Sequence, residues 1–272
     1  MNKQGCWRAV MLGILPLLFI GCAASRPPLA PRLAPEPFMV MPAATVERMA
    51  LLNFVEQNQQ AQVDGRLLAD GPEYARVSAI AARITPQARL LRPDVETWKW
   101  QVALIDAPTV NATCAPGGKV TFFTGLIRQL ALSDDEIAIV MGHEVAHALR
   151  EHGRGRLSQA MVQNGLTSGL VAAVPGRQGQ LQAASKLAHY LFMLPNSRDN
   201  ESEADQIGLE LAARAGYDPR AAISLWQKMA SAADGPALPQ FLSTHPTTAS
   251  RAGELRAMMP AMLALYQTAR QP

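Results

Sequence analysis

The sequence predicts a mostly helical α+β domain with one small β-sheet. Apolar residues recur at helical spacing in several segments, whereas only two short segments alternate as strands do. The chain is 49% hydrophobic and 17% charged, a composition that excludes a disordered protein. At roughly 100–200 residues per domain, its 272 residues form one large domain or two small ones.

The charge balance argues against nucleic acid as a partner. The formal net charge is +3, and it falls to +1 once Lys3 and Arg8 are lost with a segment that we expect to be removed. Only 6% of the residues are aromatic, too few to suggest a base-stacking surface. Neither property favours binding to a polyanion.

Residues 1–21 are typical of a bacterial lipoprotein signal peptide. Lys3 and Arg8 flank the start of an uncharged run, Ala9–Ile20, that is shorter than the roughly 20 residues of a membrane-spanning helix. The segment from Leu18 to Cys22 resembles a lipobox, after which the cysteine is lipidated. The alternative is an ordinary secretory signal with a chance cysteine.

Residues 22–44 combine the lipidated cysteine with a proline-rich tether. Six prolines between Ala23 and Ala44 predict an extended segment of about 3.1 Å per residue. Several acyl chains would anchor the protein firmly, and the absence of Asp after the cysteine favours the outer membrane, facing the periplasm. Cys114 is then the only cysteine left unmodified, so no intrachain disulfide is expected.

Residues 45–272 form the predicted folded domain, with a core at about residues 72–259. The helix that follows Ser133 is the best defined, because Ser133 and Glu136 form a capping box before an apolar run, and Gly153 is the expected stop. The other expected elements are helices Ala44–Gln60, Pro72–Ile84, Arg198–Ala215, Pro219–Ala230 and Thr248–Met259, strands Trp98–Ile105 and Val120–Phe123, and a Gly- and Gln-rich mobile lid at about residues 155–194.

The helix after Ser133 carries a metal-binding motif. His143 and His147 are four residues apart and therefore lie on one face, where both imidazoles can reach one ion. Glu144 lies one step round the helix, placed to take a proton from water rather than to bind the metal. This pattern also occurs by chance, but the apolar helical context favours a zinc site.

A third ligand is expected from the helix at Arg198–Ala215. Glu201 and Asp205 share a face of that helix, and Glu203 points elsewhere. We assign Glu201 to zinc and Asp205 to the second N–H of a ligand histidine, with Glu203 as the competing ligand. The alternative is an acidic helix start favoured by the helix dipole.

Five motifs resemble a known family of zinc metallopeptidases that includes HtpX, BepA and the CAAX prenyl endopeptidases. The motifs lie at His143–His147, Ser197–Asp205, Ala215–Pro219, Asn111–Gly118 and Thr244–Arg251. The resemblance implies a zincin-like domain of gluzincin type, with the small β-sheet beside the motif helix. Because neither TPR repeats nor the transmembrane helices of HtpX are found, the chain is most similar to small outer-membrane lipoprotein members.

The resemblance also implies roles for further residues. His245 would stabilise the transition state or close the open metal position, and Arg251 would line the same cleft. The alternative for His245 is a Thr-His-Pro turn capped by its own hydrogen bonds. Asn111 and Ala112 would precede the strand that pairs with an extended substrate, or Asn111 is a turn residue after Pro108. His152 and His189 are interpreted as structural or surface residues.

These inferences predict a metalloendopeptidase with one zinc ion per chain. The expected substrates are unfolded or misassembled envelope polypeptides, the role is protein quality control, and the expected partners are the membrane and the outer-membrane assembly machinery. Two alternatives stay open. One is a chaperone-like binding module with a structural zinc, and the other is a latent peptidase held off by His245.

Overall fold

A computed structural model of the chain describes residues 39–163, 192–234, 239–246 and 248–271, with four isolated residues between 164 and 191. The predicted signal peptide, Cys22 and nearly all of the proline-rich tether lie outside the described residues, as does most of the predicted lid. The elements in chain order are α1 (Ala43–Val63), β1 (Leu67–Leu68), α2 (Gly71–Ile84), the 3-10 helices η1 (Thr85–Leu90) and η2 (Pro93–Thr97), β2 (Gln101–Ile105), β3 (Ala112–Ala115), β4 (Lys119–Phe123), α3 (Thr124–Gln129), α4 (Asp134–Leu149), α5 (His152–Gln163), α8 (Arg198–Arg214), α9 (Ala221–Ala233), α10 (Gln240–Thr244) and α11 (Ala249–Ala269).

The four described strands form one mixed sheet in the order β1-β2-β4-β3. β2 and β4 are parallel, whereas β1 pairs antiparallel with β2 and β3 pairs antiparallel with β4. Gly117 and Gly118 make the turn between β3 and β4 with φ of 78° and 77°, a conformation that side chains disfavour. In this order β3 is an edge strand, and no described strand pairs with its outer edge.

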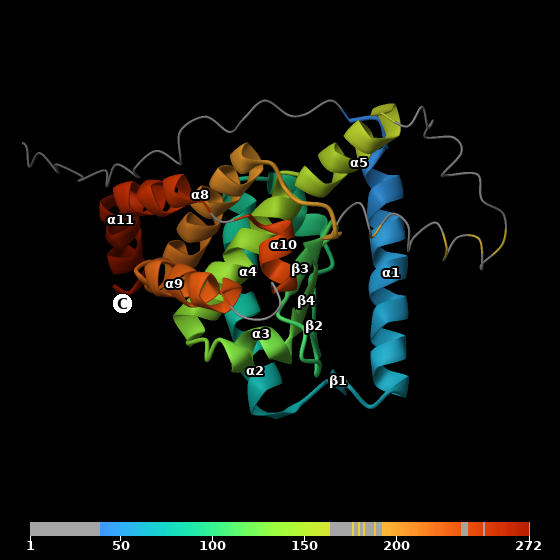
Figure 1. Cartoon of the computed structure of the whole chain (residues 1–272), viewed down its shortest axis with the longest axis horizontal. Helices are drawn as coiled ribbons and strands as arrows, with labels where there is room; N and C mark the ends of the chain where they lie inside the picture. The colour runs from blue at the N-terminus through green and yellow to red at the C-terminus, as the bar shows by residue number, and fades with distance from the viewer. Residues whose placement is uncertain are drawn as a thin grey trace, which may run out of the picture.

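The sheet lies between α1 on one side and the helical body of the protein on the other (Figure 1). Its residues alternate accordingly, as a strand period of two requires. Cys114 and Phe122 face the main core with α2 and α4, whereas Ala115 joins a smaller cluster with Met49 of α1 and Leu157 of α5. α8 packs on the far side of α4, α11 packs on α8, and α9 packs against α4 and α11 (Figure 1).

The predicted capping box at the start of α4 is present. Ser133 Oγ accepts a hydrogen bond from the Glu136 N–H at 3.2 Å, and Glu136 Oε2 accepts one from the Ser133 N–H at 2.8 Å. The predicted stop at Gly153 is wrong, because α4 ends at Leu149 and Gly153 lies inside α5. The turn falls instead on Glu151, which has a φ of 52° in the left-handed region that usually takes glycine.

Two glycines let α4 and α8 cross in direct backbone contact. A Cβ atom added to Gly142 would lie 2.4 Å from the carbonyl oxygen of Gly208, and one added to Gly208 would lie 2.5 Å from the backbone nitrogen of His143. No side chain fits at either position without moving a helix. The crossing therefore brings the motif helix unusually close to the helix that carries the acidic residues.

The sheet differs from expectation in its extent. The predicted strand at Trp98–Ile105 begins only at Gln101, because Trp98 and Trp100 precede it as an extended segment with their rings 5.3 Å apart. β1 was not predicted because its two residues are too few for a periodic signal. β3 has no periodic signal because its sequence, Ala-Thr-Cys-Ala, lacks the large residues that mark strands, and only the resemblance implies a strand here.

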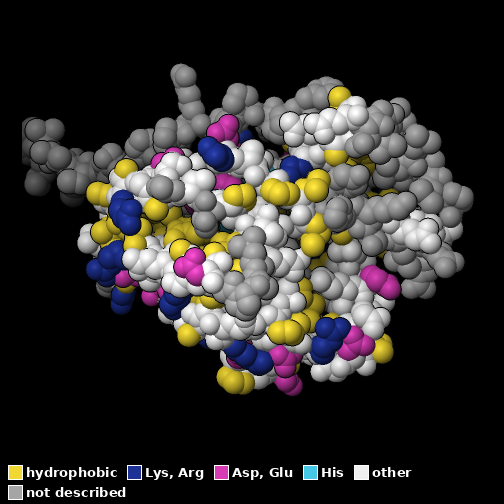
Figure 2. Space-filling model, viewed as in Figure 1, with side chains coloured by type: hydrophobic (Ala, Val, Ile, Leu, Met, Phe, Trp, Pro, Cys, Tyr) yellow, Lys and Arg dark blue, Asp and Glu magenta, His cyan; other side chains and the backbone are white. Residues whose placement is uncertain are grey.

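The surface shows no large segregation of charge on the face drawn in Figure 2, where acidic and basic side chains lie interspersed. Among the described residues, the helices are each too short or too polar to cross a bilayer.

Candidate metal centre

α4 contributes three buried polar side chains to one site. His143, Glu144 and His147 are 4%, 4% and 8% exposed, although most of α4 is apolar. Their burial follows from the position of α4 between the sheet and α8. Polar groups this deep in a core require partners, and their partners come from other helices.

Glu201 of α8 meets the two histidines, as the sequence spacing predicts. Its carboxylate lies 3.5 Å from His143 Nε2 and 3.4 Å from His147 Nε2, while the two Nε2 atoms are 3.0 Å apart. The side chain is 1% exposed. Ser197 positions it by capping α8, since Ser197 Oγ accepts a hydrogen bond from the Asn200 N–H at 3.1 Å.

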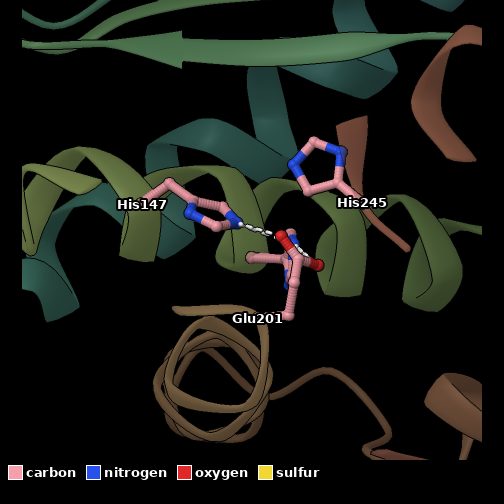
Figure 3. Close-up of side chains that lie close together, drawn as sticks. His147, Glu201 and His245 are labelled. Carbon is pink, nitrogen blue, oxygen red and sulfur yellow. Dashed lines mark hydrogen bonds and ion pairs between the residues drawn. The ribbon is translucent and has the colours of Figure 1, made fainter. Parts of the chain in front are cut away.

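His245 completes a set of four potential ligands. One nitrogen or oxygen atom from each of His143, His147, Glu201 and His245 lies within 4.8 Å of the others. Figure 3 shows His147, Glu201 and His245 turned towards a common point. The chain after α10 is held here because the Asn196 N–H, just before α8, donates to the Thr244 carbonyl at 3.0 Å.

The chemistry of this set fits a zinc ion. Glu201 Oε1 is buried and has no hydrogen-bond donor among the described residues. Zinc bonds of about 2.0–2.1 Å in a tetrahedral site hold two nitrogens roughly 3.3 Å apart, close to the separation of the two Nε2 atoms. Imidazole nitrogens with one carboxylate form a donor set that zinc prefers.

Asp205 supports His143 from behind. Its Oδ1 lies 3.1 Å from His143 Nδ1, which is the carboxylate–histidine contact that orients metal ligands. Arg251 in turn donates to both oxygens of Asp205, at 2.6 and 2.8 Å, and lies 2.7 Å from Glu201. These charges hold the pKa of Asp205 low in spite of its burial, which by itself raises it.

Arg251 is therefore placed differently from the expectation that it lines the cleft. Its side chain is 3% exposed, and its guanidinium stacks over Trp226 at 4.3 Å. It binds the carboxylates of Asp205 and Glu201 and so holds both in place. The spacing to His245 could not reveal this, because the direction in which Arg251 points depends on how α11 packs against α8.

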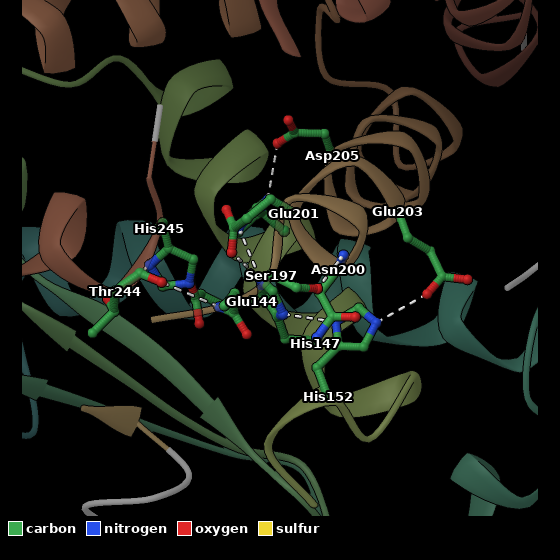
Figure 4. Close-up of polar contacts among 12 residues, drawn as sticks. Glu144, His147, His152, Ser197, Asn200, Glu201, Glu203, Asp205, Thr244 and His245 are labelled. Carbon is green, nitrogen blue, oxygen red and sulfur yellow. Dashed lines mark hydrogen bonds and ion pairs between the residues drawn. The ribbon is translucent and has the colours of Figure 1, made fainter. Parts of the chain in front are cut away.

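Glu203 is directed away from the four ligands, which argues against it as the metal ligand. Its oxygens accept hydrogen bonds from Arg150 Nε at 2.9 Å and contact His152 Nε2 at 2.9 Å. His152 is 3% exposed and lies against His147, so it belongs to the site's surroundings (Figure 4).

Glu144 borders a small, partly open cavity next to the ligands. The cavity measures about 30 Å³, room for about two water molecules. It is lined by Thr113, Cys114, Pro116, Glu144, His147, Ala148, Glu151, Gly153, Arg156, Phe192, Asn196, Thr244 and His245. Arg156, Phe192 and Asn196 carry no motif signal in the sequence that could have identified them as part of the site.

Burial tunes two groups at this cavity. It raises the pKa of Glu144 to about 8, and the negative charge of Glu201 adds to the rise while His143 opposes it. It lowers the pKa of His245 to about 3, so that this imidazole is neutral. His245 Nδ1 lies 3.0 Å from the Phe241 carbonyl, to which it donates, and this leaves a lone pair on Nε2, 3.4 Å from Glu144 Oε1.

Asn111 and Ala112 lie where the free edge of the sheet approaches the cavity. Asn111 Oδ1 accepts a hydrogen bond from the Ala112 N–H at 2.9 Å, which fixes the start of β3. Two residues of β3, Thr113 and Cys114, line the cavity. A chain segment paired with this edge would therefore run past Glu144.

Comparisons with known proteins give a consistent result. The model of peptidase family M48 matches residues 74–259. The mitochondrial metalloendopeptidase OMA1 of Bos taurus is 36% identical over 192 residues, which cover 66% of this chain and 36% of the relative. OMA1 of Arabidopsis thaliana is 38% identical over 157 residues, which cover 58% of this chain and 31% of the relative.

A bacterial relative is the beta-barrel assembly-enhancing protease of Escherichia coli, 30% identical over 165 residues that cover 56% of this chain and 33% of the relative. The chain thus spans about a third of the length of these three relatives. The motifs in the sequence predicted the bacterial relative, known as BepA, but they did not point to the mitochondrial enzymes.

Proposed function

The chain belongs to peptidase family M48, and from this we propose that it is a zinc-dependent endopeptidase that cleaves unfolded or misassembled polypeptides. One observation carries the proposal. His143, His147 and Glu201 converge from two helices within reach of one ion, and Glu144 lies buried beside them. The names of the relatives, metalloendopeptidase and protease, support the same activity.

Each residue of the site has a role in peptide hydrolysis. When bound, zinc supplies Lewis acidity towards a peptide carbonyl and towards water. Glu144 accepts the proton of the attacking water at its carboxylate and delivers it to the leaving amine, a role that its buried position beside the ligands allows. Asp205 and Arg251 keep His143 and Glu201 oriented throughout.

β3 supports an extended substrate. Its free edge offers backbone groups for pairing, and such pairing reads the backbone more than the side chains. Specificity for sequence is then loose, which suits an enzyme that acts on unfolded chains. Asn111 and Ala112 would position the substrate at the start of this strand.

The small size of the cavity favours a second form of the same function, a latent peptidase. A cavity of about 30 Å³ cannot admit a polypeptide, and His245 presents a lone pair where the substrate carbonyl would have to enter. In this arrangement His245 acts as a fourth ligand rather than as a donor to the transition state. Cleavage then requires that the segment bearing His245 move away.

We place the enzyme at the periplasmic face of the bacterial outer membrane, lipidated on Cys22, with quality control of envelope proteins as its role. The lipobox-like segment and the proline-rich tether support this location. The name of the Escherichia coli relative supports a link to the outer-membrane assembly machinery. Loss of membrane association after Cys22→Ser, measured by fractionation, is the expected result, and an unchanged membrane fraction would exclude the lipid anchor.

Hydrolysis of casein by the purified protein tests the activity. Glu144→Gln should bind zinc as the wild type does and lose cleavage by at least a hundredfold, because the proton acceptor is removed. Glu254→Gln, an exposed change on α11, is the control. Cleavage retained in Glu144→Gln would reject the proposed mechanism.

A second measurement separates the enzyme from a binding module with a structural zinc. A chelator should abolish cleavage, whereas a module that only binds polypeptides would show none at any zinc concentration. His245→Ala should cleave faster than the wild type if the latent form is correct. An inactive His245→Ala protein that still binds zinc would instead assign His245 to the transition state.

A further inference from the structure

His147 has an unusual support on the side that faces away from the ligand set. Its Nδ1 lies 2.8 Å from Nδ1 of His152, and Nε2 of His152 lies 2.9 Å from Oε2 of Glu203. Figure 4 shows this row of side chains running from the cavity towards the start of α8. All three lie deep in the protein, and the Glu203 side chain is the most exposed at 11%.

Hydrogen positions along the row follow from its carboxylate end. An ionised carboxylate only accepts hydrogen bonds, so the hydrogen of His152 is on Nε2, towards Glu203. His152 is 3% exposed, and Arg150 already balances the charge of the Glu203 carboxylate at 2.9 Å, so the ring is neutral and has a lone pair on Nδ1. Only a donor can then face that atom at 2.8 Å, and the donor is Nδ1–H of His147.

The result for His147 is that its Nε2 carries a lone pair. This atom is the one that faces His143 and Glu201. The opposite assignment would set the lone pair of His152 Nε2 against the Glu203 carboxylate at 2.9 Å, where two acceptors repel each other. Glu203 therefore decides, across two rings, which nitrogen of His147 is free.

The two ligand histidines are thus oriented by different means. His143 contacts the carboxylate of Asp205 directly, at 3.1 Å, whereas His147 reaches its carboxylate through an imidazole. The turn at Glu151 makes this possible, because its left-handed backbone folds α5 back so that His152 returns to His147.

We propose that Glu203 and His152 form a positioning pair that fixes the tautomer of His147 and so prepares its Nε2 to bind the metal ion. The pair touches neither the substrate nor the ion. The inference rests on the metal site of the proposed function and adds two residues to it. It predicts effects on zinc binding that precede any effect on catalysis.

Zinc affinity of the purified full-length protein, measured by competition with a chelating dye, tests the pair. Glu203→Gln should weaken binding by about 10–100-fold, the usual cost of losing such an outer contact, because the amide can donate to His152 and reverse the row. The control is Glu254→Gln, which makes the same change at an exposed position of α11, outside the ligand set and the cavity. The zinc affinity of the control should match that of the wild type within about threefold.

Two substitutions of His152 separate hydrogen bonding from packing. His152→Asn keeps an acceptor near the position of Nδ1 and should retain most of the affinity, whereas His152→Phe keeps the ring and should lose it to the extent that Glu203→Gln does. Equal affinity of all variants and the wild type would overturn the proposal. A wild type that fails to bind zinc would instead defeat the proposed function.

The tautomer can be observed directly and needs no variant. Nitrogen–hydrogen correlation spectra of the zinc-free wild type should show His147 with its hydrogen on Nδ1. A hydrogen on Nε2 of His147 would overturn the proposal whatever the affinities of the variants.

Discussion

The crossing of α4 and α8 at Gly142 and Gly208 determines whether the metal centre forms, and Gly208→Ala tests this. The added Cβ would lie 2.5 Å from the His143 backbone nitrogen and 2.7 Å from the His143 Cα. An ordinary contact needs 3.4 Å or more, so the helices must separate by about 1 Å. The neighbours are backbone atoms, which cannot rotate away as a side chain can.

Both stability and metal binding should suffer in Gly208→Ala. Overpacking of this kind costs about 1–3 kcal/mol, which corresponds to a fall in Tm of roughly 2–12 °C for a domain of this size. A shift of about 1 Å between the helices also exceeds the roughly 0.5 Å within which a functional site must be held. Zinc affinity should therefore fall by at least tenfold, because His143 and Glu201 lie on opposite sides of the crossing.

Thermal melting and dye competition for zinc measure the two effects. Gly253→Ala on α11 is the matched control, because a Cβ there meets no atom within 4 Å. It should raise stability by about 0.5–1 kcal/mol, as alanine does in a helix, and leave zinc binding unchanged. Wild-type Tm and zinc affinity in Gly208→Ala would refute the argument that close backbone packing aligns the ligands.

Three further outcomes are expected. Burial raises the pKa of Glu136, but hydrogen bonds from Lys228, Ser224 and the Ser133 N–H outweigh it and hold the pKa below the usual 4.5. Glu136→Gln should therefore lower the free energy of unfolding at pH 7 by about 1–2 kcal/mol. In urea unfolding, the difference between the two proteins should shrink as the pH falls below 4.5, and a difference that does not depend on pH would contradict this. Arg251→Met should cost about 3–5 kcal/mol in the same assay, because Asp205 is left buried without its partner, and a loss under 1 kcal/mol would show that the pair is dispensable. Zinc at a hundredfold excess over its Kd should stabilise the wild type by about 2.7 kcal/mol, seen as a Tm that falls on chelation, and an unchanged Tm would exclude a specific site in the folded state.

Much of the main helices was predictable because the signals are local. The capping box at Ser133 and Glu136 is a pattern within four residues, and the structure has both of its hydrogen bonds. The end of α4 was missed for the same reason. Gly153 is the glycine that a local pattern selects, but the left-handed turn falls on Glu151. The contact that favours this turn is the one between His152 and His147, which the local pattern does not contain.

The sequence by itself determined the chemistry of the centre. The spacing of His143 and His147 needs only one helix to place both imidazoles on a face, and Glu144 follows from the same helix. Family membership likewise follows from motifs in order along the chain.

Only the tertiary structure decided which groups surround that chemistry. Helical spacing left Glu201 and Glu203 as rivals, and the crossing of α4 and α8 directs Glu201 to the histidines and Glu203 to His152. The position of Arg251 behind the ligands and the approach of His245 likewise depend on how distant helices pack. The physical reason is that helical periodicity is a local property, which fixes only the direction of a side chain about its own helix. The distance between two helices depends on the atoms at their contact, which here are Gly208 and the backbone of α4.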